Sequence, residues 1–161
     1  MNPTTRPAII YLSGPITTGG NVPVNVRRGI EAGLRLMELG FVVIIPHEKA
    51  FGAEMLKPSS YEDWMTYDFR CIDAADATYR MGDGRGTPWP SVGADRECVY
   101  TREIGKCVYH SEETLLARYP GGRVELHPMY RVDVGNGSCP GFTPSTPWLP
   151  YYIDHSREKK A

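Results

Sequence analysis

Short apolar runs alternate with segments of helical periodicity along this chain, and this alternation limits its possible folds more than any other feature. Continuous apolar runs that end at Gly or Pro are typical of buried strands. Two runs fit this pattern closely and two fit it less well, so we expect strands at residues 8–13, 41–45, 76–81 and 105–110. Helical patterns lie between them, at residues 23–39, 61–75 and 91–104. This order predicts right-handed βαβ units and a parallel sheet with helices on both faces.

The helical segments carry further signals of packing and capping. In the first segment we expect a buried face formed by residues at helical spacing: Val26, Ile30, Leu34 and Met37. A capping box that begins at Ser59 or Ser60 predicts the start of the second segment, and residues 50–60 are expected to form a loop. A short helix at residues 111–119 and a short strand at 123–127 would complete a sheet of four to five strands.

The character of the sequence changes near residue 127. Residues 1–127 hold all the alternating elements and are expected to form the α/β domain. Residues 128–161 are rich in Pro and Gly, which argues against a packed domain of their own. We expect them to form an irregular C-terminal arm that lies on the domain or on a partner subunit, anchored by Trp148, Tyr151 and Tyr152.

Composition narrows the range of partners. The 161 residues carry a net charge of −1, so no basic field favours a nucleic-acid polymer. The 4 cysteines form no CxxC pair, which predicts no metal site and fits a reducing compartment. No signal peptide and no apolar run long enough to span a membrane are present. We therefore expect a cytoplasmic protein that does not bind membranes.

The stretch from Pro88 to Glu97 is the strongest candidate for a site. A turn-rich loop leads into a helix whose N-cap would be Ser91, and Gly93 is small enough for a ligand to approach the backbone. A helix N-terminus offers free N–H groups and the positive end of a dipole, which suits a phosphate. Glu97 can face the same cleft as a nucleophile or base. The alternative is a capped surface helix with a solvated Glu97.

Other candidate residues also follow expected strands. Ser13-Gly-Pro ends the first strand, and His47 follows the second, where it is either a ligand contact or an ordinary loop residue. Trp64 and Asp68 share a helix face and could stack on and hydrogen-bond a flat heterocycle, or be a core aromatic and a solvated charge. Ligands of open parallel sheets bind beyond the carboxyl ends of the strands. No GxGxxG or GxxxxGK[ST] motif supports a dinucleotide or P-loop site.

Four motifs in this order resemble the nucleoside 2-deoxyribosyltransferase superfamily. They are Ile10-Tyr-Leu-Ser-Gly-Pro, Trp64-x-x-x-Asp68, Asp73-Ala-Ala-Asp76 and Ser91-x-Gly-Ala-x-x-Glu97, and the resemblance covers about residues 8–110. It implies a flavodoxin-like (Rossmann-like) three-layer sandwich that cleaves the N-glycosidic bond of a nucleoside or nucleotide. It also implies a homodimer or higher homo-oligomer, and no cofactor.

The resemblance assigns roles residue by residue. The glutamate that matches Glu97 attacks the anomeric carbon, the tyrosine that matches Tyr11 orients it, and the aspartate that matches Asp68 contacts and protonates the leaving base. The expected substrate-binding residues are Ser91, Gly93, Ala94, Gly14, Pro15, Ile16, His47, Trp64 and Trp89. The first loop, Pro15-Ile-Thr-Thr-Gly-Gly, departs from the residues that the related enzymes use.

Ser91 directs the choice among substrates. Classical nucleoside transferases carry an aspartate here, whereas the branch with serine uses it for the 5′-phosphate. Replacing a carboxylate by a hydroxyl removes a repulsion of roughly 1–4 kcal/mol against a phosphate at contact distance. The sequence therefore predicts an N-glycosidase acting on a (deoxy)nucleoside 5′-monophosphate. The alternatives are a 2-deoxyribosyltransferase that exchanges bases and a non-catalytic nucleotide sensor.

Overall fold

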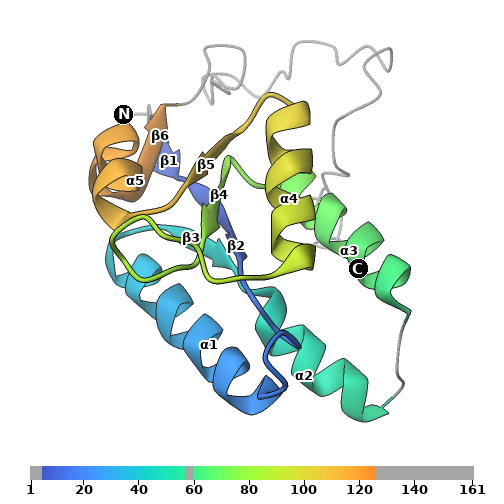
Figure 1. Ribbon diagram of the computed structural model, residues 1–161. Coiled ribbons are helices and arrows are strands. Elements are labelled where there is room, and N and C mark those ends of the chain that lie inside the picture. The colour runs from blue at the N-terminus through green and yellow to red at the C-terminus, as the bar shows by residue number, and fades with distance from the viewer. Residues whose placement is uncertain (1–4, 57–59, 126–161) are drawn as a thin grey trace, which may run out of the picture.

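The computed structural model describes residues 5–56 and 60–125, in which strands and helices alternate (Figure 1). The predicted C-terminal arm, 128–161, and the boundary before it lie outside the described residues. Within the described ranges, no helix has the length and apolar content needed to cross a bilayer. The elements are β1 (Thr5–Pro7), β2 (Ile9–Ser13), α1 (Val22–Glu38), β3 (Val42–Ile44), α2 (Pro46–Leu56), α3 (Tyr61–Ala74), β4 (Ala77–Arg80), α4 (Val92–Glu103), β5 (Cys107–Tyr109), α5 (Glu112–Arg118), the 3₁₀ turn η1 (Pro120–Gly122) and β6 (Arg123–Glu125).

The central sheet has 4 parallel strands in the order β3–β2–β4–β5, which confirms the predicted flavodoxin-like α/β fold. The connection from β2 leads to β3 on one side, and the next strand, β4, lies on the other side of β2. This reversal opens a crevice beyond the carboxyl ends of β2 and β4. The predicted short strand at 123–127 forms as β6, but it pairs antiparallel with β1 in a separate sheet of 2 strands.

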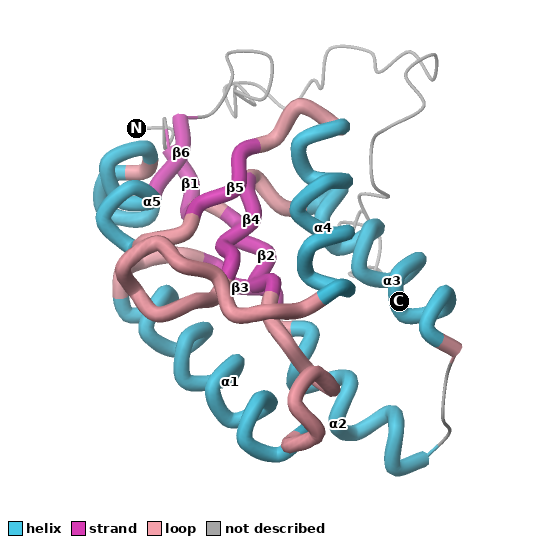
Figure 2. Tube along the Cα trace, in the orientation of Figure 1, coloured by secondary structure: helices cyan, strands magenta, loops and turns pink. Residues whose placement is uncertain are grey.

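Helices cover both faces of the sheet, with α1 and α5 on one side and α3 and α4 on the other (Figure 2). Successive residues of β2 alternate between the two layers because side chains of a strand point to opposite faces. Ile10 and Leu12 join the core under α1 and α5. Tyr11 packs with Ile72 of α3 on the opposite face. This alternation decides which β2 side chains can reach α4.

The predicted buried face of α1 is partly wrong. Val26 is buried, but Leu34 is 50% exposed and Met37 51% exposed. Small residues face inward instead: a Cβ atom added to Gly33 would lie 2.2 Å from Ile45 Cδ1. Close approach of α1 to the segment after β3 therefore requires glycine on the contact face, and Leu34 and Met37 turn outward.

The segment 50–60, predicted as a loop, is largely helical, because α2 runs from Pro46 to Leu56. Pro46 ends β3, as expected, but proline also fits the first turn of a helix, where its missing N–H is not needed. The next helix begins as predicted: Ser60 and Asp63 form a reciprocal capping box at the start of α3.

Lys106, which directly precedes β5, caps the carboxyl end of α3. Its Nζ donates to the carbonyl oxygens of Ile72 at 2.9 Å, Asp73 at 2.6 Å and Ala75 at 2.7 Å. The last carbonyls of a helix have no intrahelical partner, and a cation satisfies them and complements the helix dipole. One side chain thus ties the end of α3 to the edge strand β5.

Replacing Lys106 by methionine leaves these partly buried carbonyls without donors. We expect Lys106→Met to lower the free energy of unfolding by about 1–3 kcal/mol, measured by urea denaturation. Arg85→Met removes the same charge from an exposed loop residue and is expected to change stability by less than about 0.5 kcal/mol. Equal stabilities of the two variants would contradict the capping role.

Candidate active site

A pocket of about 590 Å³ opens beyond the carboxyl end of β2, between α3 and α4. Many of its lining residues were predicted from the sequence to be site residues: Gly14, Ile16, Trp64, Asp68, Ser91, Gly93, Ala94 and Glu97. The loop after β2 brings the first two, α3 the next two and the start of α4 the rest. The fold therefore gathers residues from three separate parts of the sequence around one cavity.

Glu97 projects from the second turn of α4 toward the end of β2 and is only 6% exposed. Tyr11 Oη donates to its Oε1 at 3.0 Å. Ser13 Oγ donates to Glu97 Oε2 at 2.5 Å, and Ser13 Oγ also lies 3.3 Å from the carbonyl oxygen of Ala94. Both carboxylate oxygens are thus held by hydroxyl groups from one strand, and Glu97 cannot swing away from the pocket without breaking both bonds.

Two carboxyl groups share this buried space. Burial and, next, the nearby charge of Asp68 raise the pKa of Glu97 to about 8, although the hydroxyl groups of Ser13 and Tyr11 oppose the shift. Burial also raises the pKa of Asp68 to about 6, although hydrogen bonding to Tyr11 and Glu97 opposes the shift. Such groups titrate as a pair, and the pair retains a proton near neutral pH. Burial, with these carboxylates, raises the pKa of Tyr11 well above its ordinary value.

The N-terminus of α4 forms another wall of the pocket. Ser91 is the N-cap, as predicted, and its Oγ accepts from the Ala94 N–H at 3.3 Å. A hydroxyl that accepts one bond still has its own proton to donate. The first amides of a helix have no intrahelical acceptor, so those of Val92 and Gly93 are also suited to an anion.

Asn25, which sequence reasoning did not single out, shapes the loop between β2 and α1. Its Nδ2 donates to the carbonyls of Ile16 at 3.0 Å and Thr18 at 2.8 Å. Ile16, Thr17 and Thr18 line the pocket. The buried amide of Asn25 therefore sets the shape of one pocket wall from the neighbouring helix.

His47 does not join the pocket. Its ring packs against α1, where a Cβ atom on Gly29 would lie 2.4 Å from His47 Cγ. It is 1% exposed, and neither ring nitrogen has a hydrogen-bond partner among the described residues. Burial lowers the pKa of His47 to about 4, against the opposing effect of the Pro15 carbonyl. His47 is thus a neutral core residue at the start of α2, and Pro15 is buried beside it.

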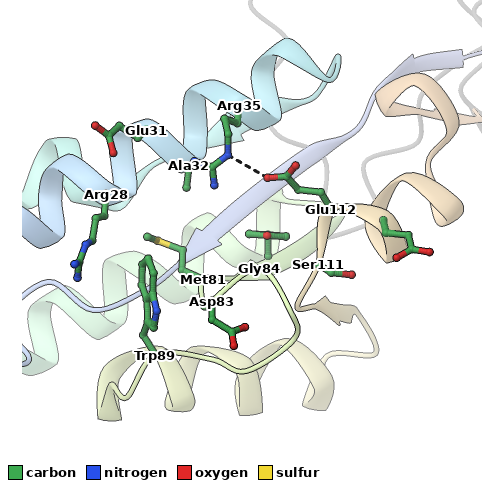
Figure 3. A pocket seen from close by; sticks show the side chains of 13 residues that line it. Arg28, Glu31, Ala32, Arg35, Met81, Asp83, Gly84, Trp89, Ser111 and Glu112 are labelled. Carbon is green, nitrogen blue, oxygen red and sulfur yellow. Dashed lines mark hydrogen bonds and ion pairs between the residues drawn. The ribbon is translucent and has the colours of Figure 1, made fainter.

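Trp89 lies in a different cavity, of about 460 Å³, between α1, α5 and the loop after β4 (Figure 3). The guanidinium of Arg28 sits 5.2 Å from the centre of its ring. Tyr79 and Met81, which belong to the core under α1 and α5, also line this cavity. The cavity is therefore on the face of the sheet opposite to α3 and α4. Trp89 therefore cannot form a wall of the pocket that holds Glu97.

The sequence analysis did not predict every contact of the site. It noted Ser13 only at the end of the first strand, although Ser13 lies two residues after Tyr11 in the same strand and must share its face. Tyr61 and Met65 repeat at helical spacing with Asp68 and line the same pocket. Across residues 5–56 and 60–125, no three His, Cys, Asp or Glu side chains gather in a way that could hold a metal ion.

Comparisons with known proteins give a family and a similar structure. The model of a family described as a domain of unknown function (DUF4406) matches residues 8–110. No curated protein matches the chain. Among solved structures, a 2-deoxyribosyltransferase from the psychrotolerant bacterium Bacillus psychrosaccharolyticus is 25% identical with a TM-score of 0.45, over 63% of this chain and 69% of that one.

Because the pKa of Glu97 is raised in the folded protein, ionisation of this carboxyl group should lower the stability of the fold. An acid whose pKa is higher in the folded than in the unfolded chain destabilises the fold as pH rises between the two values, here from 4.5 to about 8. We expect Glu97→Gln to be more stable than wild type by about 1–3 kcal/mol at about pH 8.5 and by much less at about pH 5. Urea denaturation at both pH values measures this. Glu103→Gln, an exposed change on the same helix, is the control; the same pH dependence in both variants would contradict the assignment.

Proposed function

The chain belongs to the family described as a domain of unknown function (DUF4406), and from its site we propose that it cleaves the N-glycosidic bond of a nucleoside 5′-monophosphate. The products are the free base and a (deoxy)ribose 5-phosphate. One observation carries the proposal: the buried carboxyl of Glu97 is held by Tyr11 and Ser13 at the edge of a pocket that also contains Asp68.

Glu97 is the proposed nucleophile. Glycosidic cleavage passes through a state in which positive charge develops on the sugar, and a carboxylate at the anomeric carbon stabilises that charge or bonds to it. As the C1′–N bond breaks, its electron pair goes to the base and Glu97 forms an ester with C1′. Water then hydrolyses the ester, which releases the sugar phosphate and restores the carboxylate.

Asp68 is the proposed acid for the leaving base. The hydroxyl groups of Tyr11 and Ser13 donate to Glu97 and favour its charged form, whereas Asp68 Oδ1 is buried without a hydrogen-bond partner among the described residues. Burial gives Glu97 the higher pKa of the two, so the reactive form of the pair is the one in which the proton has moved to Asp68. The hydroxyl groups that donate to Glu97 stabilise this form, and the proton can then pass from Asp68 to the departing base. Two carboxyl groups then have opposite roles at neutral pH.

The N-terminus of α4 is the proposed phosphate subsite. Ser91 is 8% exposed and faces the pocket with Val92 and Gly93. Its hydroxyl and the first amides of the helix can donate to the 5′-phosphate, and Ser91 itself carries no charge to repel it. Glu97 lies less than two turns further along the same helix, which matches a substrate whose phosphate and anomeric carbon are both bound by α4.

The base would lie between α3 and the loop after β2. Trp64 and Tyr61 offer aromatic rings there, and Met65 and Ile16 are apolar. Such a lining favours a flat heterocycle that is oriented by few polar groups. His47 and Trp89 are not part of this subsite, and the predicted homodimer or higher oligomer stays a prediction.

The decisive assay follows free base by HPLC. We expect wild-type protein to release base from at least one ribo- or deoxyribonucleoside 5′-monophosphate, and Glu97→Ala to lower the rate by about a thousandfold or more. Glu103→Ala, on the exposed face of the same helix, is expected to keep wild-type activity. A second free base in the mixture detects transfer.

The other outcomes overturn the proposal in distinct ways. Base exchange that outpaces hydrolysis, with unphosphorylated nucleosides as donors, would identify a deoxyribosyltransferase. Nucleotide binding without base release, unchanged in Glu97→Ala, would identify a sensor.

Substitutions of Ser91 that add or omit a negative charge test the proposed phosphate subsite. Ser91→Asp keeps a good N-cap but places a carboxylate beside the phosphate, at a cost of roughly 1–4 kcal/mol. We expect kcat/KM for the monophosphate to fall by about ten- to a thousandfold. Ser91→Asn keeps the cap without the charge and is expected to lose much less. If both variants lose activity equally, charge at this position does not select the substrate.

A further inference from the structure

Arg80, the last residue of β4, is a buried cation that does not line the pocket. Its side chain is 1% exposed, whereas Asp95, the carboxylate with which it forms an ion pair, is 66% exposed. Its Nε has no hydrogen-bond partner among the described residues. Burying a guanidinium in this way is costly, so a structural or functional benefit must offset it.

The hydrogen bonds of Arg80 bracket Ser91. One terminal nitrogen, Nη2, donates to the carbonyl of Trp89 at 2.6 Å and to Asp95 Oδ1 at 2.9 Å. Trp89 comes two residues before Ser91, and Asp95 lies four residues after it, in the first turn of α4. The guanidinium of Arg80 thus binds both the loop before α4 and the first turn of α4, and the N-cap Ser91 lies between these two contacts.

Arg80 also stands beside the residue that holds Glu97. In the register of the parallel strands, Ser13 of β2 pairs with Arg80 of β4. Neighbouring residues of paired strands point to the same face, so both side chains meet α4. Ser13 holds the second turn of the helix through Glu97, and Arg80 holds the first turn through Asp95.

We propose that Arg80 is the positioning residue for the phosphate subsite, fixing the N-cap Ser91 and the loop before it against the first turn of α4, so that the hydroxyl of Ser91 and the first amides face a 5′-phosphate. The inference rests on the proposed function and adds to it the residue that makes the site selective for a phosphorylated sugar. Arg80 acts through the backbone of Trp89 and through Asp95. Its buried positive charge favours an anion at the same end of α4.

The test compares Arg80→Met, Arg80→Lys and Asp95→Asn with wild type in the full-length chain. KM and kcat are measured with the best monophosphate, and binding of ribose 5-phosphate is measured by calorimetry. Arg80→Met is expected to raise KM and the Kd of ribose 5-phosphate by about ten- to a hundredfold, because hydrogen bonds to a charged group are lost. The kcat value should change by less than about threefold, because Tyr11, Ser13 and Glu97 keep their contacts.

The other two variants guard against loss of folding in Arg80→Met. Lysine keeps the charge, but its side chain is one bond shorter and its nitrogen falls short of the position of Nη2, so Arg80→Lys should fall between wild type and Arg80→Met. Asp95→Asn keeps an oxygen acceptor but removes the charge that pairs with Arg80, which weakens one contact at an exposed site and should raise KM by about two- to fivefold. Wild-type KM and Kd in Arg80→Lys and Asp95→Asn would overturn the inference, as would an equal loss of kcat and of affinity in folded Arg80→Met.

The proposed function fails separately. A wild-type protein that neither releases base from any monophosphate nor binds ribose 5-phosphate would overturn both proposals. Base release by wild type together with unchanged Arg80 variants would overturn only the positioning role.

Discussion

The docking of α4 onto the carboxyl end of β2 is the constraint on which the site depends. A carboxylate that is removed from water is stable only if its oxygens find donors, and Tyr11 and Ser13 supply them to Glu97 from one face of one strand. These bonds set the height and rotation of the helix against the sheet. Its N-terminus then opens into the pocket, because Glu97 and Ser91 belong to the same two turns.

The part of α4 that borders the pocket has a different electrostatic character at each end. Near Glu97, two carboxyl groups share a proton because both are buried and close together. Toward the start of the helix, the free amides, the hydroxyl of Ser91 and the guanidinium of Arg80 all favour negative charge. The proposed substrate, with a phosphate at one end and a nucleobase as leaving group at the other, matches this distribution of charge. The strand β2 binds the second turn of α4 through Ser13 and Glu97, and the strand β4 binds the first turn through Arg80 and Asp95.

The corrections to the sequence-based expectations share a physical cause. The periodicity of α1 pointed to Leu34 and Met37, but a helix that packs closely uses small residues such as Gly33 on its contact face. The helix α2 has no apolar stripe of helical period, so it was taken for a loop. In both cases a tertiary contact outweighed the local pattern.

Local chemistry by itself determined the alternation of most elements, the parallel fold and the cap at Ser91, and it limited the cap of α3 to Ser59 or Ser60, because each depends on residues a few positions apart. It also marked Asp68 and Glu97 as site candidates, and the resemblance to a known superfamily added Tyr11. Only the tertiary structure decided that these three meet, that His47 faces the core and that Trp89 faces another cavity. Which way a side chain faces depends on strand register and helix packing across distant segments, and no local pattern carries that information.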